Sequence, residues 1–469
     1  MKALIDVVAT PEQLALFSRV RPGVEVIRGA AGSGKTTTAI RNVRSGVCCY
    51  VARRWRQKAP RPVRVLVLTF NRTLRGYVKE LTQKQFVAGD AIALEVSTFA
   101  SWAYGLLGRP QMINDADQKI RELSAGLSLD AQFSIEETHY LLSRFLPEDI
   151  DNYLTARRDG RGGTPRMERK AREALLSDVV RPYIEYKIAN SLWDWNDLAV
   201  ALAVNTKSSY DVVVVDETQD FSANEIRAVM NQVAEEHTMT FVLDSAQRIY
   251  ARNFAWTEAG VTVRPETSHR LTTNYRNSKQ IARFAGAILN GITADEDGSM
   301  PNFESATREG AIPIVISGKF GAQLAYVINQ IKLTVDLKSE SVAFLHPKGY
   351  GWFKTVRQVL TSEGLAYVEL SAKEDWPEGD ANIALSTLHS AKGLEFDHVF
   401  IIGLDAETTS MGENHVTEIK DDERLDNLRR LVAMGVGRAR KTVVIGHRSD
   451  AAPAVAAFFD PATCNKINV

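Results

Sequence analysis

The stretch GAAGSGKTTTA, from Gly29 to Ala39, decides the fold of this chain. Its first eight residues satisfy the pattern GxxxxGK[ST], with the apolar run GVEVIRG before it and a helical pattern after it. Such a loop aims backbone N–H groups and a helix N-terminus at phosphate oxygens, and glycines permit the tight turn. A chance glycine-rich turn is the alternative, but the flanking strand and helix patterns favour a phosphate-binding loop.

The chemistry of this loop assigns roles to its side chains. We expect Lys35 to reach the β- and γ-phosphates of ATP, and the Thr36 hydroxyl to ligate Mg²⁺. The nucleotide contacts predicted in the loop are Gly29, Gly32, Ser33, Gly34, Lys35, Thr36 and Thr37.

The run VVVVDETQD supplies the second half of the predicted nucleotide site. Four valines indicate a buried strand, and Asp216 and Glu217 follow at its carboxyl end, where ligands bind in open α/β sheets. We expect Asp216 to hold Mg²⁺ through its hydration shell, and Glu217 to orient and deprotonate the attacking water. Two acids that cap the next helix are the alternative, but the matching loop upstream favours catalysis.

Further apolar runs of strand length recur between helical patterns. In the first half they are VRVLVLTF (63–70), YDVVVVDE (210–217) and TMTFVLD (238–244). In the second half they are AIPIVIS (311–317), SVAFLHP (341–347), NIALSTL (382–388), DHVFIIG (397–403) and KTVVIGH (441–447). Continuous β-branched runs fit strands buried on both faces of a parallel sheet, so the two series predict two α/β domains in tandem.

Composition places the chain among ordinary cytoplasmic proteins. Lysine plus arginine and aspartate plus glutamate number 57 each, which argues against bulk electrostatic coating of nucleic acid but allows a local basic groove. The three cysteines (Cys48, Cys49 and Cys464) form no disulfide framework or metal-site spacing. The N-terminal stretch lacks the features of a signal peptide, and we find no apolar run long enough for a membrane span.

Gln13 illustrates an ambiguous residue. The stretch TPEQ, from Thr10 to Gln13, is a good helix start, with Thr as N-cap, Pro at the first position and Gln closing a capping box. A nucleotide contact is the other interpretation.

The remaining motifs resemble one family, the superfamily 1 helicases of the UvrD/Rep/PcrA type, in order from Gln13 to Arg440. The stretches that carry the resemblance are TPEQLALF, VLVLTFNRTLRGYV, VSTFASWAYGLL, WDWNDLAVAL, VVVVDETQD, FVLDSAQRIY, TTNYRNSKQIARFA, STLHSAKGLEFDHVFIIGL and RRLVAMGVGRARKTVVI. The resemblance implies an α/β fold with two RecA-like parallel-sheet motor domains of the P-loop NTPase class.

The same resemblance implies further nucleotide contacts. Gln13 matches an adenine-reading residue, Tyr275 a residue that stacks on adenine, and Glu395 a contact to the ribose side. Arg276 and Arg438 match arginines that reach the phosphates from the second domain. The implied catalytic set is Lys35, Glu217, Gln247, Arg276 and Arg438, with Gln247 as the γ-phosphate sensor and Gln219 as the residue that couples hydrolysis to strand binding.

Nucleic-acid contacts are also implied, because aromatic platforms and a polar track bind single strands in this class. The matching positions are Phe70, Asn71, Thr98, Phe99, Arg252, Phe254, Thr387 and His389. For Phe70 and Phe99 the alternative is core packing at a strand end, and for His389 a helix-cap role. Arg252 and Asn253 stand where the family usually carries tryptophan and arginine, and Gly437 stands where it usually carries threonine.

The predicted domains are residues 1–107 with 193–270, a small helical insertion at 108–192 whose basic tip lies at 157–166, and residues 271–469. The second accessory domain of the family is missing or vestigial between 286 and 381. We therefore expect an ATP- and Mg²⁺-dependent translocase on single-stranded DNA, with 3′→5′ direction implied by the resemblance and RNA as a less favoured track. The alternative is a nucleotide-gated nucleic-acid-binding subunit with a partner such as a nuclease, within a repair, mobile-element or phage-defence complex.

Overall fold

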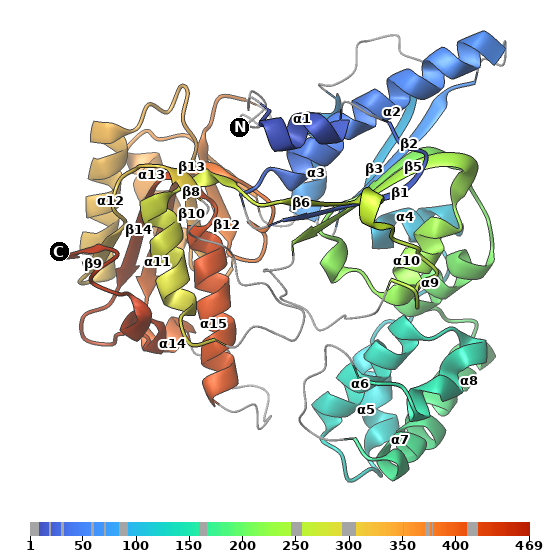
Figure 1. Cartoon of the computed structure of the whole chain (residues 1–469). Coiled ribbons are helices and arrows are strands. Elements are labelled where there is room, and N and C mark those ends of the chain that lie inside the picture. The colour runs from blue at the N-terminus through green and yellow to red at the C-terminus, as the bar shows by residue number, and fades with distance from the viewer. Residues whose placement is uncertain are drawn as a thin grey trace.

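The computed structural model of the chain describes residues 9–17, 20–29, 32–57, 61–69, 72–83, 92–158, 167–244, 256–292, 306–349, 351–370, 376–377, 379–409 and 421–469. Two parallel sheets, each covered by helices, lie side by side, and a helical unit hangs below the first (Figure 1).

The first sheet has six strands in the order β3-β2-β4-β5-β1-β6, and all its pairings are parallel. The strands are β1 (Gly23–Gly29), β2 (Val63–Thr69), β3 (Ile92–Thr98), β4 (Tyr210–Val215), β5 (Val233–Asp244) and β6 (Ser268–Leu271). Because β1 lies inside the sheet, the loop that follows it opens at the carboxyl edge between neighbouring strands.

Alternate residues of these strands pack against different helices. Val65 and Val67 belong to the apolar cluster that includes α2, whereas Leu66 and Leu68 belong to the cluster that includes α4 and α9. This burial on both faces explains why the strands read as continuous apolar runs. The helices are α1 (Pro11–Phe17), α2 (Lys35–Gln57), α3 (Arg72–Gln83), α4 (Phe99–Leu106), α9 (Trp195–Val204) and α10 (Ala223–Met230).

A helical insertion between α4 and α9 has an apolar core of its own. It comprises α5 (Ala116–Ser124), α6 (Ala131–Arg144), a 3-10 helix (Pro147–Leu154), α7 (Arg169–Leu175), a π-helical turn (Leu176–Val180) and α8 (Arg181–Ala189). Arg144 joins it to the first domain, because its guanidinium donates to both carboxylate oxygens of Glu258 at 2.9 Å. Asn224 of α10 donates to the carbonyls of Leu142 and Phe145 at 2.9 Å, so the insertion is docked by polar contacts.

The second sheet has seven strands in the order β11-β12-β10-β13-β14-β9-β15, again parallel. The strands are β9 (Ile314–Ser317), β10 (Val342–His346), β11 (Tyr367–Glu369), β12 (Ile383–Thr387), β13 (Phe396–Leu404), β14 (Ala439–His447) and β15 (Asn465–Asn468). The short pair β7 (Asn274–Ser278) and β8 (Ala306–Arg308) lies beside it.

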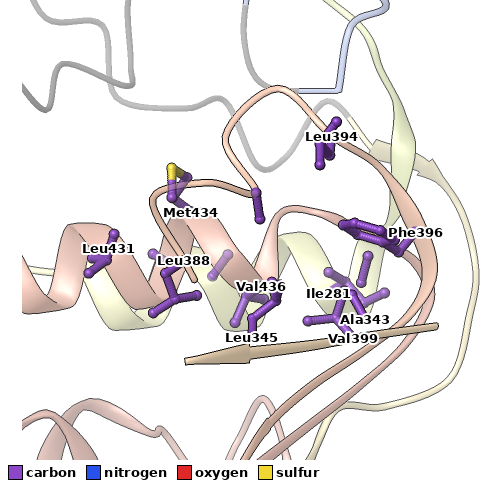
Figure 2. Close-up of a cluster of buried hydrophobic side chains, with 14 of the residues drawn as sticks. Ile281, Ala343, Leu345, Leu388, Leu394, Phe396, Val399, Leu431, Met434 and Val436 are labelled. Carbon is purple, nitrogen blue, oxygen red and sulfur yellow. The ribbon is translucent and has the colours of Figure 1, made fainter. Parts of the chain in front are cut away.

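Helices cover both faces of the second sheet as well. They are α11 (Lys279–Leu289), α12 (Phe320–Thr334), α13 (Lys354–Ser362), α14 (Ala406–Thr409) and α15 (Asp421–Val436). Figure 2 shows Leu431, Met434 and Val436 of α15 packed with Leu388 and Phe396 around the loop that follows β12. This core holds the loop from β12 to β13, which carries functional candidates.

The predicted fold class is confirmed: two parallel α/β units stand in tandem, and the first carries a helical insertion. Each apolar run predicted as a strand lies on one. The strands that the sequence did not single out are short, except β3, whose apolar pattern is interrupted by Glu95 and ends in Ser97 and Thr98. The three cysteines are free. Among the described residues, no helix combines the length and apolar character needed to cross a membrane.

Candidate nucleotide site between the two sheets

The loop between β1 and α2 makes a turn that its glycines permit. Gly32 and Gly34 adopt positive φ angles of 81° and 77°. A Cβ atom at Gly34 would lie 2.2 Å from Nε2 of Gln13, and one at Gly32 would lie 2.3 Å from Oδ1 of Asn274. Both glycines are therefore required by backbone conformation and by the close approach of other segments.

Three polar side chains of this loop and of the first turn of α2 are predicted nucleotide contacts: those of Lys35, Ser33 and Thr37. Nζ of Lys35 donates to the Gly29 carbonyl at 2.8 Å, so the ammonium group lies over the loop. The Ser33 hydroxyl is buried and has no hydrogen-bond partner among the described residues. Thr37 is half-buried in the first turn of α2. A buried hydroxyl without a partner in the described part of the chain, just before the N-terminus of α2, suits a phosphate ligand.

Thr36 and Asp216 meet across the site. The Thr36 hydroxyl donates to the two carboxylate oxygens of Asp216 at 3.1 and 2.9 Å. Burial raises the pKa of Asp216 to about 7, and the adjacent Glu217 carboxylate contributes to the rise. A divalent cation would offset both effects, and a hydroxyl with a carboxylate is a donor set that Mg²⁺ takes while keeping several waters. The residues present therefore fit Mg²⁺.

Glu217 follows Asp216 in a left-handed backbone conformation with φ of 51°. Its side chain is buried, and Nε2 of Gln219 donates to its carboxylate. Left-handed backbone in a residue other than glycine is costly and persists where the surroundings enforce it, commonly at functional sites.

Gln13 caps helix α1 and also contacts the loop after β1, so the helix-cap interpretation does not exclude a role at the nucleotide site. Its backbone N–H donates to the Thr10 hydroxyl at 3.3 Å, and its side-chain oxygen accepts from the Thr10 N–H at 3.1 Å, as in a capping box. Its Nε2 also donates to the Ser33 carbonyl at 3.0 Å. The helix cap thus places this amide directly against the phosphate loop.

The strand β7 brings residues of the second unit to the same loop. The backbone N–H groups of Tyr275 and Arg276 donate to the Gly32 carbonyl at 3.1 and 3.2 Å. The Arg276 guanidinium pairs with Glu395 and donates to the Gly437 carbonyl at 3.4 Å. Its Nε atom is buried and has no partner among the described residues. The Tyr275 ring is 37% exposed.

Glu395 and Arg438 directly precede the neighbouring strands β13 and β14, at the amino ends of these strands. Arg438 is 2% exposed, and its Nε donates to the Met434 carbonyl at 3.3 Å. Burial opposes ionisation of Glu395, but the charges of Arg276, Arg440 and Arg438 outweigh it and lower the pKa of that carboxyl. Glu395 therefore lies as an anion among arginines, and its contact in this structure is Arg276.

Two residues that the sequence did not single out connect the two units. Lys392, in the loop after β12, pairs with Asp220, and its Nζ lies 3.9 Å from Oε2 of Glu217. The Lys392 side chain is 3% exposed and that of Asp220 is 0% exposed. The available signals were the lysine of the stretch SAKGLEF, which carried the family resemblance, and the final acid of VVVVDETQD.

Among the residues predicted to contact a nucleic-acid strand, Thr98, Thr387 and His389 are polar and lie at or just after the ends of β-strands. The Thr98 hydroxyl accepts from the Ser101 N–H at 3.3 Å and caps α4, and the Thr387 hydroxyl accepts from the Ser390 N–H at 3.0 Å. His389 lies exposed in the same turn. Thr98 and Thr387 are the last residues of β3 and β12, at the carboxyl edges of the two sheets, and His389 lies just beyond β12.

Phe99 requires a correction. The prediction made it a platform for a base, but its side chain is 5% exposed and its ring packs edge-on against Trp102 and Phe221, at centroid distances of 5.6 and 6.2 Å. The ring is part of the core and presents no free face for stacking. The alternative interpretation, core packing at a strand end, holds for Phe99.

Trp195 is an exposed ring that the sequence analysis did not single out. It starts α9, is 59% exposed and lies 6.4 Å from the Tyr104 ring. Its segment, residues 193–202, carried the resemblance, but only the structure shows that the ring faces solvent. The predicted residues Phe70, Asn71, Gln247, Arg252 and Phe254 lie outside the described residues.

Comparison with known proteins gives two matching family profiles. Residues 10–261 match the UvrD/REP helicase N-terminal domain, and residues 353–449 match the UvrD-like helicase C-terminal domain. The first profile alone spans more than half of the chain.

Individual relatives agree with these profiles. A probable DNA helicase of Mycoplasma pneumoniae is 22% identical over 417 residues, which cover 81% of this chain and 73% of that protein. The ATP-dependent DNA helicase PcrA of Leuconostoc citreum is 38% identical over 76 residues, 16% of this chain and 10% of that protein. PcrA of Staphylococcus aureus is 31% identical over 103 residues, 22% of this chain and 14% of that protein.

Among solved structures, the C-terminal domain of a possible DNA helicase from Lactobacillus plantarum shares 18% identity. The match covers 41% of this chain and 99% of that domain with a TM-score of 0.30, which is too low to carry an argument.

Proposed function

The chain belongs to the UvrD/REP helicase family, and on this premise we propose that it is an ATP-driven translocase that moves 3′→5′ along single-stranded DNA. As a member of this family it is an ATP-hydrolysing enzyme of the DNA-helicase class. The direction of travel rests on the family resemblance. We further propose that residues 1–107 with 193–270 and residues 271–469 are its two motor domains.

The observation that carries the proposal is the contact between the phosphate loop and the second unit. Arg276, which follows the last strand of the first sheet, is bonded through its backbone to Gly32, while its side chain contacts Glu395 and Gly437. One nucleotide bound at the loop would therefore touch both units. Its binding and hydrolysis can change how the two sheets lie relative to each other, which is the movement a translocase needs.

The residues of the site divide the chemistry among them. Lys35 and the loop N–H groups would hold the phosphates, and Thr36 and Asp216 would hold Mg²⁺, which neutralises charge as the γ-phosphoryl group is transferred. Glu217 would orient the attacking water and accept its proton. Arg276 and Arg438 would stabilise the charge that develops on the phosphoryl oxygens. Gln13 and Tyr275 would bind the adenine.

A single strand would lie across the carboxyl edges of the two sheets. Thr98 and Thr387 end strands at those edges, and His389 lies in the turn after Thr387. The exposed Trp195 ring offers a face on which a base can stack. Since Phe99 is buried, Trp195 is our candidate for the aromatic platform of the first unit. RNA is the alternative track.

One observation favours a second candidate function. Between α11 and β12, the described residues 306–370 form strands and helices of the second unit, with no accessory domain among them. A chain of this build could act as a nucleotide-gated subunit that switches a partner, such as a nuclease, and unwinds little by itself. Its ATPase would then depend on that partner.

The test is the ATPase rate of the whole chain alone and with single-stranded DNA, duplex DNA or RNA. We expect single-stranded DNA to stimulate the rate strongly and duplex DNA of equal length to do so weakly. The Glu217→Gln protein, measured in parallel, reports any contaminating ATPase. Equal rates with and without nucleic acid would contradict the translocase proposal and favour the partner-switched subunit.

A further inference from the structure

The segment that contains the phosphate loop is strongly basic in a chain of balanced charge. From Val26 to Lys79 it has thirteen lysines and arginines and no aspartate or glutamate, although the whole chain has 57 basic and 57 acidic residues. Such asymmetry indicates a surface for a polyanion. Few of these cations are needed for one nucleotide, so the others call for a separate explanation.

Helix α2 displays part of this charge on its outer face. Its inner face, which includes Val43 and Val47, packs on the first sheet. On the outer side Arg44 and Arg56 are exposed, and neither has an ion pair among the described residues. Residues 44, 48, 52 and 56 recur every four positions and so share one face of the helix.

Trp55 stands beside Arg56 at the far end of this helix. Its side chain is 79% exposed, the largest exposed fraction among the large apolar side chains described. Exposing an indole ring to water is unfavourable because a large apolar area stays unburied. Exposed rings of this kind are therefore typical of surfaces that bind a ligand or a partner. A flat ring next to guanidinium groups suits a nucleic-acid strand, because bases stack on the ring and phosphates pair with the arginines.

Neighbouring cations hold this end of the helix in place rather than binding a ligand. Arg54 and Arg61 both pair with the buried carboxylate of Asp211, and Arg53 pairs with Glu236 at 2.7 Å. These contacts fix the end of α2 to β4 and β5. Trp55 and Arg56 are therefore carried on a rigid support, which lowers the entropy cost of binding.

The end of α2 that carries Trp55 and Arg56 is separate from the nucleotide site. It is also separate from the proposed track for the nucleic-acid strand, which includes Thr98, Thr387 and His389. Trp55 lies twenty residues beyond Lys35 along one helix, which corresponds to about 30 Å. Figure 1 shows α2 running away from the second sheet to the outer end of the first unit. The polar residues of the predicted track, by contrast, lie at the carboxyl edges of the strands.

We propose that the outer face of α2, formed by Arg44, Trp55 and Arg56, is a second contact surface for single-stranded nucleic acid. It would bind a part of the strand beyond the segment held in the track. This inference rests on the proposed function for its ligand class. An acidic protein partner is the competing occupant. The charge of the whole segment and its continuity with the phosphate loop and the following strand favour nucleic acid.

The test compares two lengths of oligothymidylate, one that just fills the track and one about ten nucleotides longer. The Trp55→Ala/Arg56→Gln protein should bind the longer strand about tenfold more weakly than wild type, since one stacked base and one phosphate contact are lost. Its affinity for the shorter strand should equal that of wild type. Because both side chains are exposed, thermal unfolding should be unchanged.

Leu333→Ala is the matched control, because Leu333 is 78% exposed on α12 of the other unit. It should bind both strands as wild type does. An equal loss for both lengths would overturn the proposal by making the surface part of the main track. Unchanged affinity for both would overturn it in favour of a protein partner. If the wild-type protein binds neither strand, the proposed function itself fails.

Discussion

Glu217 is the residue that we propose as the base for ATP hydrolysis. It follows Asp216 with φ of 51°, a conformation that costs about 1–3 kcal/mol in a residue other than glycine. Its carboxylate contacts Gln219 and lies 3.9 Å from Nζ of Lys392. The left-handed backbone turns this carboxylate away from the line of β4, toward Gln219 and Lys392.

We predict that Glu217→Gln keeps ATP binding and lowers the turnover rate at least about a hundredfold, because an amide cannot accept the proton of the attacking water. Binding of a fluorescent ATP analogue and steady-state hydrolysis measure the two effects. Hydrolysis at the wild-type rate would show that another group is the base.

A substitution of Glu395 can distinguish two roles for this residue, because the role implied by the resemblance and the contact seen in the structure differ. The resemblance assigns it to the ribose, whereas in the structure it pairs with Arg276. If Glu395 positions Arg276, Glu395→Gln should lower kcat about tenfold or more with little change in KM for ATP. The preference for ATP over 2′-deoxy-ATP should not change. A loss of that preference with normal kcat would restore the ribose role.

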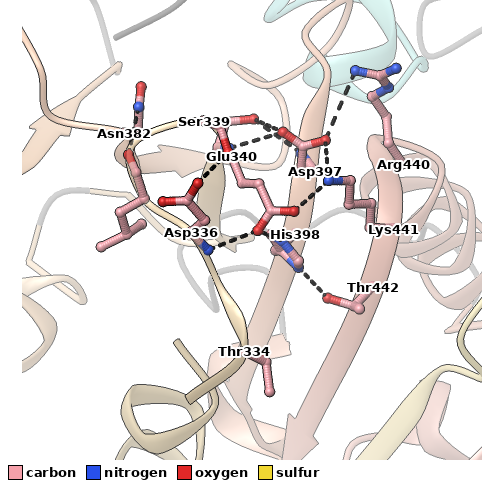
Figure 3. Close-up of polar contacts among 12 residues, drawn as sticks. Thr334, Asp336, Ser339, Glu340, Asn382, Asp397, His398, Arg440, Lys441 and Thr442 are labelled. Atoms are coloured by element: carbon pink, nitrogen blue, oxygen red, sulfur yellow. Dashed lines mark hydrogen bonds and ion pairs between the residues drawn. The ribbon is translucent and has the colours of Figure 1, made fainter. Parts of the chain in front are cut away.

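At the scale of elements, a polar cluster joins the amino ends of β10, β13 and β14 (Figure 3). The Glu340 carboxylate accepts from the Asp336 N–H at 2.9 Å, contacts His398 at 3.2 Å and pairs with Lys441. Burial opposes ionisation of Glu340, but these contacts outweigh it and lower its pKa to about 2. The cluster therefore ties three strands together through one ionised carboxylate.

This pKa predicts the pH dependence of the cluster. Because the folded-state pKa lies below the unfolded value of about 4.3, the stabilisation is complete above that value and is lost as the pH falls toward 2. Glu340→Gln should therefore lower the thermal midpoint clearly at pH 7, less at pH 3 and very little at pH 2. Glu363→Gln is the control, since its partner Lys332 is exposed and such pairs contribute little. A difference that stays constant with pH would contradict the ionic explanation.

At the scale of the whole molecule, the buried pair of Lys392 and Asp220 connects the second unit to the first. The pair is nearly inaccessible to solvent and adjoins Glu217. Breaking a buried pair by removal of one partner costs about 3–5 kcal/mol, because the other charge stays buried and uncompensated. The pair thus links the relative position of the two units to the Glu217 carboxylate.

We predict that Lys392→Met lowers both the thermal midpoint and the ATPase rate. The double variant Lys392→Met/Asp220→Asn, which removes both charges, should recover most of the stability. It should recover little of the rate if Lys392 also acts on Glu217. Calorimetry and steady-state hydrolysis on four proteins, the wild type, Lys392→Met, Asp220→Asn and the double variant, complete a double-mutant cycle. Additive effects of the two substitutions would show that the residues are not coupled.

The sequence by itself determined the features that depend on local pattern. The glycine loop, the acids after the valine run and the apolar runs of both sheets are read from neighbouring residues, because strand burial and loop geometry leave short-range signatures. Gln13 was recognised as a helix cap for the same reason. These signals were sufficient for the fold class, and they located the loop that we propose binds phosphate.

The tertiary structure alone decided which side chains meet across long sequence distances. Phe99 could stack on a base or pack in the core, and packing against Phe221, 122 positions later, places it in the core. The Lys392–Asp220 pair joins residues 172 positions apart, and Arg276 reaches Glu395 across 119. Such contacts depend on how the sheets and helices pack in space. No local pattern in the chain records that packing.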